Sequence, residues 1–325
     1  MIPYYKNLLP IFLLVFMPSC MQLCQKPITK KTLAKPIPLP IANDAKQTTL
    51  SKDSLPPITI WIHGTRLLPK SLFKNFFYSK PGLHHYTEVE PIFYQHKIAQ
   101  TLIASNPNKF PAQTFYLFGW AGALSSQERE VAALQLYKDL KVVRSQYQAM
   151  YGAEPVIHII SHSHGGNIAL LLEKVKDQND SNFFIQQLIV LACPVQLQTM
   201  KYACAPLFGK IYSLYSMLDI FQIADMQGLH KQNPQPPLFS RRLFLPDEKI
   251  EQVAVKINQR SIMHMEFITL KFLSQLGMIL DEIDSWHAKS PFALAQWMQQ
   301  NKCISLITKT PKHVRAVRET NKKSK

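Results

Sequence analysis

The stretch PVIHIISHSHGGNIALLLEKV, residues 155–175, decides how this chain of 325 residues folds. Its first half contains a run of β-branched residues that favours a buried strand: Val156, Ile157, Ile159 and Ile160. In its second half apolar residues return at helical spacing: Ile168, Leu171, Leu172 and Val175. Two serines, two histidines and two glycines stand between the halves. The stretch therefore predicts a strand that turns sharply into a helix, with Ser163 on the turn.

Strand and helix patterns alternate along the rest of the chain. Further apolar runs have the length and composition of strands: 58–62, 114–118, 187–191, 210–215 and 252–257. The best helical pattern covers residues 128–147. Short apolar strands separated by helices predict an α/β fold, with a mostly parallel, doubly wound sheet covered by helices on both faces. Residues 194–210 and 226–248 fit this pattern poorly, and we expect them at strand ends, where ligands bind.

Ser163 occupies the nucleophile position of a G-x-S-x-G turn between strand and helix. Ser161 replaces the first glycine of that pattern, Gly165 supplies the second, and Gly166 lets the helix start close to the sheet. A serine there can attack a substrate, because the turn exposes its hydroxyl and the helix N-terminus attracts negative charge. The alternative is a structural serine on a histidine-rich turn.

An oxyanion hole is predicted from two main-chain N–H groups, those of Thr65 and His164. Thr65 follows His63 and Gly64 after an early strand, and His164 follows the proposed nucleophile. The side chain of His63 is interpreted as a structural hydrogen-bonding group rather than as an acid or base.

An acid and a histidine follow later strands, in that order. Asp219 comes just after the run 210–215, and His264 follows the run 252–257. Asp225 is the alternative acid, but its approach has the spacing of a helical turn leading away from the sheet. Ser163, His264 and Asp219 are therefore the predicted catalytic triad, in which the acid orients the histidine and the histidine takes the serine proton.

These features resemble the α/β-hydrolase superfamily, specifically bacterial lipase-like and esterase-like serine hydrolases with an HSHGG turn. The resemblance covers residues 58–280 and is carried by HGT at 63–65, FGWAGALSSQERE at 118–130, SHSHGGN at 161–167, SMLD at 216–219 and MHMEF at 263–267. It implies the α/β-hydrolase fold and a serine esterase or lipase. The element from Trp120 and Gly122 to Arg129 resembles a W-x-G…R segment of some such hydrolases, which either contacts substrate or packs beneath the site.

Apolar residues expected in the insertions favour a lipid-like ester: Phe208, Tyr212, Tyr215, Leu238 and Phe239. A peptidase or amidase of the same fold stays open, because no residue excludes it. The alternative from another class is a non-catalytic binding lipoprotein. No cofactor is expected, since the chain has neither a P-loop nor a dinucleotide-binding glycine pattern. A metal site at His158, His162 and His164 is disfavoured, because the turn separates them and no carboxylate accompanies them.

Residues 1–19 have the pattern of a lipoprotein-type signal peptide, with Lys6 before an apolar run too short to cross a bilayer comfortably. Cys20 follows Met17-Pro18-Ser19 and is the predicted lipidation site, with Cys24 a weaker second candidate. Residues 20–57 are rich in Lys, Pro, Thr and Gln and are expected to form a disordered tether. These features predict a membrane-anchored lipoprotein of the bacterial cell envelope, with a secreted or periplasmic protein and an uncleaved N-terminal anchor as the alternatives.

The hydrolase domain is expected at 58–300, followed by a basic tail at 301–325. The formal net charge is +16, and the tail has eight Lys and Arg residues against one acid, Glu319. No aromatic residues are interleaved with these charges, so we expect a solvated tail and no nucleic-acid partner, with contact to an anionic lipid or polymer as the alternative. Three cysteines follow the tether, of which Cys193 and Cys204 could pair outside the cytoplasm.

Overall fold

A computed structural model describes residues 55–66, 80–221, 243–288, 303–310 and 313–318. All of them belong to one unit of the chain, Pro36–Lys325. The signal peptide, Cys20, Cys24, most of the tether and the alternative acid Asp225 lie outside the described residues.

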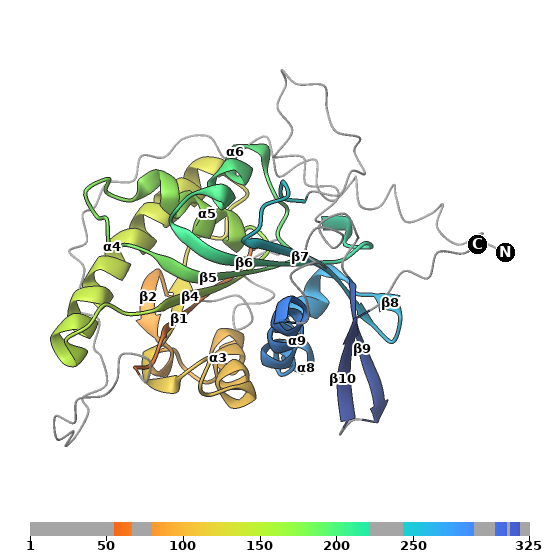
Figure 1. Ribbon diagram of the computed structural model, residues 1–325. Coiled ribbons are helices and arrows are strands. Elements are labelled where there is room, and N and C mark those ends of the chain that lie inside the picture. The colour runs from red at the N-terminus through yellow and green to blue at the C-terminus, as the bar shows by residue number, and fades with distance from the viewer. Residues whose placement is uncertain (1–54, 67–79, 222–242, 289–302, 311–312, 319–325) are drawn as a thin grey trace. The chain divides into compact units, whose positions relative to one another are not determined.

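A sheet of ten strands forms the centre of this unit (Figure 1). Its strands are β1 (Ile58–Ile62), β2 (Gly82–His85), β3 (Phe115–Gly119), β4 (Ile157–His162), β5 (Ile185–Leu191), β6 (Phe208–Tyr215), β7 (Ile250–Ile257), β8 (Arg260–Ser261), β9 (Cys303–Thr310) and β10 (His313–Arg318). They follow the order β10-β9-β7-β6-β5-β4-β1-β3-β2, and β8 pairs with β7. The strands from β9 to β3 are parallel, whereas β2, β8 and β10 pair antiparallel. The predicted α/β class is confirmed, and all six predicted strands are present.

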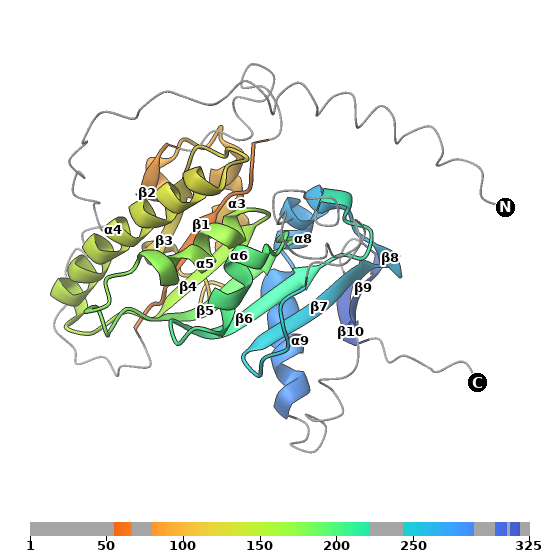
Figure 2. The same ribbon diagram turned by 90° about the horizontal axis from the view of Figure 1, so that it is seen from above.

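Helices cover both faces of the sheet because successive side chains of each strand point to opposite sides. Ile60, Ile159 and Leu188 pack on one side with α4 (Ser126–Tyr151), α5 (Gly165–Val175) and α6 (Leu197–Met200). Their neighbours Trp61, Ile160 and Ile189 pack on the other side with α3 (Tyr94–Ser105), α8 (Leu270–Leu273) and α9 (Leu276–Ala288). Figure 2 shows α4 and α5 on one side of the strands, with α9 on the other. Short 3₁₀ turns complete the fold: η3 (Tyr86–Glu88), η4 (Ala112–Thr114), η5 (Lys201–Cys204) and η7 (His264–Ile268).

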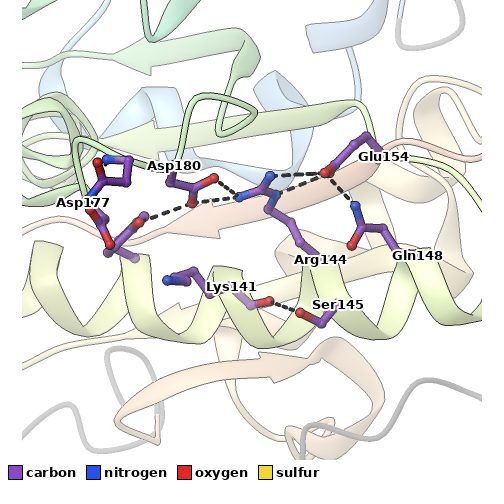
Figure 3. A network of polar contacts seen from close by, with 9 residues as sticks. Lys141, Arg144, Ser145, Gln148, Glu154, Asp177 and Asp180 are labelled. Carbon is purple, nitrogen blue, oxygen red and sulfur yellow. Dashed lines mark hydrogen bonds and ion pairs between the residues drawn. The ribbon is translucent and has the colours of Figure 1, made fainter.

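The predicted helix at 128–147 is present as α4, which is longer at both ends and covers Ser126–Tyr151. It begins where Ser125 accepts a hydrogen bond from the Glu128 amide and ends at Gly152, whose φ is +67°. Near its C-terminus, the Arg144 guanidinium lies between two carboxylates, 2.9 Å from Asp180 and 3.3 Å from Glu154 (Figure 3). These contacts join α4 to the loops that lead into β4 and β5.

The expectation of a solvated tail from residue 301 is wrong for the segment that forms β9, and β10 pairs with β9 as a further strand of the sheet. β9 pairs with β7, and Ile304 and Leu306 are buried in the core beside α9. Apolar residues alternate with polar ones at the start of β9, which suits a strand with one buried face, but the basic residues that follow β9 obscured that pattern. The edge strand β2 was also missed, because its sequence GLHH is short and half polar.

No disulfide joins Cys193, which is buried, to Cys204, which is exposed. Within the ranges that the structure describes, no helix combines the length and the apolar character needed to cross a bilayer.

Candidate active site

The predicted turn at Ser163 is present between β4 and α5. Ser163 has a φ of +53°, which lies in the left-handed region that residues other than glycine rarely adopt. Two hydrogen bonds hold this conformation: the Ser163 amide donates to the Leu191 carbonyl at 2.9 Å, and the Gly166 amide donates to the Ser163 carbonyl at 3.0 Å. A strained backbone conformation persists only where the surrounding structure holds it in place. Such conformations are common at functional sites.

Small residues around Ser163 are required by close packing. A β-carbon on Gly165 would lie 2.7 Å from the His63 carbonyl oxygen, and one on Gly166 would lie 2.6 Å from Sγ of Cys193. Ser161, which replaces the first glycine of the motif, is fully buried, and its hydroxyl donates to the Ile189 carbonyl at 3.3 Å. The departure from the motif is therefore accommodated by a hydrogen bond.

The loop after β1 touches this turn. A β-carbon on Gly64 would lie 2.7 Å from the Cβ of Ser163, so main chain and nucleophile candidate are in contact there. Thr65 follows Gly64 directly, and His164 is the N-cap of α5. The two residues predicted to form the oxyanion hole thus belong to two segments that meet at Ser163.

His63 has a structural environment. It is buried, its Nδ1 donates to the Gly64 carbonyl at 2.7 Å, and its Nε2 accepts from the Trp120 amide at 3.3 Å. The Trp120 indole N–H also donates to the His63 carbonyl at 2.8 Å. Burial lowers the pKa of His63 to about 4, so the ring is neutral at pH 7. These contacts fix the loop that carries Thr65.

Asp219 and His264 meet across 45 residues of sequence. Nδ1 of His264 lies 2.8 Å from Oδ2 of Asp219 and donates to it, since an ionised carboxylate can only accept. Asp219 is 0% exposed and His264 4% exposed. With Nδ1 protonated, Nε2 of the neutral ring is left as the basic nitrogen. The structure brings these two predicted residues together, and Asp225 lies outside the described residues.

His162 and Asn167 were not predicted to contribute to the site. His162 lies beside His264, with 4.6 Å between their ring centroids. Asn167, in the first turn of α5, is buried, and its amide nitrogen donates to the Pro194 carbonyl at 3.1 Å. Its Oδ1 accepts from the Thr199 hydroxyl at 2.6 Å, and its Nδ2 lies 3.4 Å from Nδ1 of His164. The turn is therefore tied to the loop that follows β5.

The W-x-G…R element packs beneath the site. Arg129 is buried and donates to Gln196 at 3.1 Å, and Trp120 bonds to His63 as described above. A cavity of about 530 Å³ next to Arg129 lies between the start of α4, α5 and α6, and neither Ser163 nor His264 lines it. Substrate contact through Arg129 therefore has no support from this cavity.

Three of the five residues that suggested a lipid-like substrate have another role. Phe208, Tyr212 and Tyr215 are buried in β6, because strand residues of a covered sheet face the two cores, and Leu238 and Phe239 lie outside the described residues. Exposed apolar side chains instead flank the buried pair: Leu218 and Ile220, 61% and 59% exposed, on either side of Asp219, and Met263, 57% exposed, before His264. An apolar surface therefore adjoins the candidate site.

Among the residues that the structure describes, no three His, Cys, Asp or Glu side chains are grouped as a metal site would require. His158, His162 and His164 are all buried but are not joined to carboxylates in any such group.

No family model matches the chain, and no curated protein matches it in sequence. Solved structures with a similar arrangement include an acetyl xylan esterase, 10% identical, which matches 71% of this chain and 100% of its own with a TM-score of 0.31. An α/β serine hydrolase without a lid from Xanthomonas campestris is 12% identical over 74% of this chain and 87% of its own, with a TM-score of 0.34. A hormone-sensitive lipase from a metagenome library is 13% identical over 73% and 79%, with a TM-score of 0.35.

These identities and TM-scores are too low to support an argument. The fold is instead identified from the strand order of the chain and from the geometry of the turn at Ser163. A mostly parallel sheet with an antiparallel strand at each end, β2 and β10, is covered by helices on both faces. One of its central strands, β4, ends in a sharp turn to a helix with a serine at positive φ. The chain therefore has the α/β-hydrolase fold.

Proposed function

We propose that this chain is a serine hydrolase that cleaves a carboxylic ester. The observation that carries the proposal is the buried hydrogen bond between Asp219 and His264, at the same edge of the sheet as the strained Ser163. A histidine held by a carboxylate is the arrangement that activates a serine nucleophile.

In the proposed reaction, Oγ of Ser163 attacks the acyl carbonyl as its proton moves to Nε2 of His264. The main-chain N–H groups of Thr65 and His164 hold the oxyanion, and Asp219 stabilises the imidazolium that forms. His264 then gives the proton to the leaving alkoxide, which leaves an acyl ester on Ser163. Water attacks that ester by the same route in reverse and releases the carboxylic acid.

The proposed substrate is lipid-like. Leu218, Ile220 and Met263 expose apolar side chains beside the buried pair, and an acyl chain laid over them would remove apolar surface from water. Hydrolysis of p-nitrophenyl esters from acetyl to palmitoyl tests this, with a preference for the longer chains as the expected result. Cleavage of peptide amides without cleavage of any ester would replace the proposal with a peptidase or amidase.

Ser163→Ala tests the reaction itself. We expect loss of labelling by a fluorophosphonate probe and a fall in kcat of about 10⁴–10⁶, since one triad change removes the covalent route. The circular dichroism spectrum should not change, because alanine and serine have similar backbone requirements. More than a tenth of the activity remaining in Ser163→Ala would exclude Ser163 as nucleophile. An unlabelled, inactive wild-type protein would favour the non-catalytic binding lipoprotein.

The proposed location is the bacterial cell envelope, with the domain tethered to the membrane through a lipid on Cys20. A lipidated cysteine upstream of the domain would hold the domain near a lipid substrate. Cys20→Ser should prevent incorporation of a palmitate analogue and move the protein from the membrane fraction to the soluble fraction. Cys24→Ser is the matched control and should leave both unchanged. Labelling that persists in Cys20→Ser and disappears in Cys24→Ser would transfer the anchor to Cys24.

A further inference from the structure

His162 is the last residue of β4 and directly precedes Ser163, yet it has no part in the proposed reaction. Its ring is buried, and its Nε2 lies 3.2 Å from the main-chain oxygen of His264. A carbonyl oxygen can only accept a hydrogen bond, so Nε2 of His162 carries the proton and donates. The bond links residues 102 positions apart in sequence.

The other side of the His162 ring faces the loop after β1. A β-carbon on Gly64 would lie 3.0 Å from Nδ1 of His162 and 2.7 Å from Cβ of Ser163. The loop that carries Thr65 therefore packs on His162 and Ser163 together. The His162 side chain thus contacts both the loop that carries Thr65 and the main chain of His264. The backbone of His162 continues directly into Ser163.

A neutral His162 suits this position. Burial lowers the pKa of His162 well below its ordinary value, and the neighbouring rings of His264 and His63 act in the same direction. A charge on His162 would oppose the protonation of His264, whose ring centroid is 4.6 Å away. The ring can therefore support His264 without competing for the proton that moves in the reaction.

We propose that His162 is a positioning residue, which fixes the separation of Ser163 and His264 by holding the main chain of His264 through Nε2–H. The kinetic part of this inference rests on the proposed hydrolase reaction. A proton transfer depends steeply on geometry, and a displacement of about 1 Å can cost roughly 100-fold in rate. Loss of the hydrogen bond should therefore slow the chemical step while substrate binding is retained.

Three variants test the role. His162→Ala removes the donor, and we expect kcat on an ester to fall by about 10- to 100-fold with KM changed by less than about twofold. His162→Gln places an amide N–H at nearly the position of Nε2 and should keep more than about a third of kcat. His158→Ala is the matched control, because His158 is also a buried histidine of β4 and should leave kcat within about twofold of wild type.

Histidine-selective ¹⁵N NMR gives a second measurement that needs no activity. His162 should show the neutral tautomer with the proton on Nε2 at pH 7. A proton on Nδ1 instead would overturn the inference, since the bond to His264 could not form. The inference is also overturned if wild-type protein reacts with the probe and His162→Ala is as active as His158→Ala, or if His162→Gln restores nothing. A wild-type protein without probe reaction at Ser163 would instead overturn the proposed function, and the kinetic role of His162 with it.

Discussion

At the residue scale, the state of His264 depends on Asp219. Because Asp219 is fully buried and accepts the Nδ1 proton of His264, it leaves Nε2 of that ring as the base. In Asp219→Asn, the amide N–H would stabilise the opposite tautomer, with the proton on Nε2. We therefore expect kcat to fall by about 10³–10⁴ with little change in the circular dichroism spectrum.

Asp225→Asn is the matched control for this prediction and should lower kcat by less than about tenfold. Both variants are to be measured on the same ester at one pH. A larger loss in Asp225→Asn than in Asp219→Asn would show that Asp225 is the acid.

Some residues of the candidate site could be predicted from the sequence because parallel strands end at one edge of a sheet. Ser163, Asp219 and His264 each follow such a strand, and their side chains are the nucleophile, acid and base that a catalytic triad requires. His162 and Asn167 could not be found in this way. Their roles depend on main-chain groups 102 and 27 residues distant, and nothing in the local pattern indicates those contacts.

At the scale of elements, β4 combines a hydrophobic strand with buried histidines. His158 is buried in this strand, and burial lowers its pKa to about 4. Between pH 6.5 and pH 4, the unfolded chain therefore binds a proton at His158 that the folded protein does not bind. The stabilising effect of the neutral ring is complete above the unfolded pKa and is lost as the pH falls through this window.

His158→Gln tests this linkage, because glutamine does not titrate. Each such histidine adds roughly 1.4 kcal/mol per pH unit to the slope of the free energy of unfolding against pH. Urea unfolding of the variant between pH 4.5 and pH 6 should therefore show a slope smaller by about that amount. An unchanged slope would mean that His158 is protonated in the folded protein.

The elements themselves were predictable where hydrophobic periodicity was strong. Strands β3 and β4 of the parallel core are buried on both faces and rich in apolar residues, and α4 has a regular apolar stripe with a serine cap. Strands β2, β9 and β10 were missed, because edge and hairpin strands contain polar or charged residues that resemble loops. β2 is placed by its pairing with β3, β9 by its pairing with β7, and β10 by its pairing with β9. These pairings are information from tertiary structure.

At the scale of the whole molecule, the C-terminal segment completes the sheet next to β7. β9 pairs with β7 along its parallel edge, and the side chains of Ile304 and Leu306 are buried in the core that includes α9. β7 in turn leads to the segment that presents His264. The basic end of the chain is thus partly structural, and its charge does not by itself indicate a ligand.

Deletion of residues 301–325 should therefore destabilise the domain. Burial of an Ile or Leu side chain is worth about 1.5–3 kcal/mol, so the loss of two gives at least about 3 kcal/mol. For a domain of this size we expect the melting temperature to fall by roughly 6–12 °C. The exposed edge of β7 should also make the protein more prone to aggregate.

Deletion of residues 319–325 alone is the control, because it leaves β9 and β10 intact, and it should change the melting temperature by less than about 1 °C. Equal melting temperatures for the two deletions would show that the segment does not stabilise the domain.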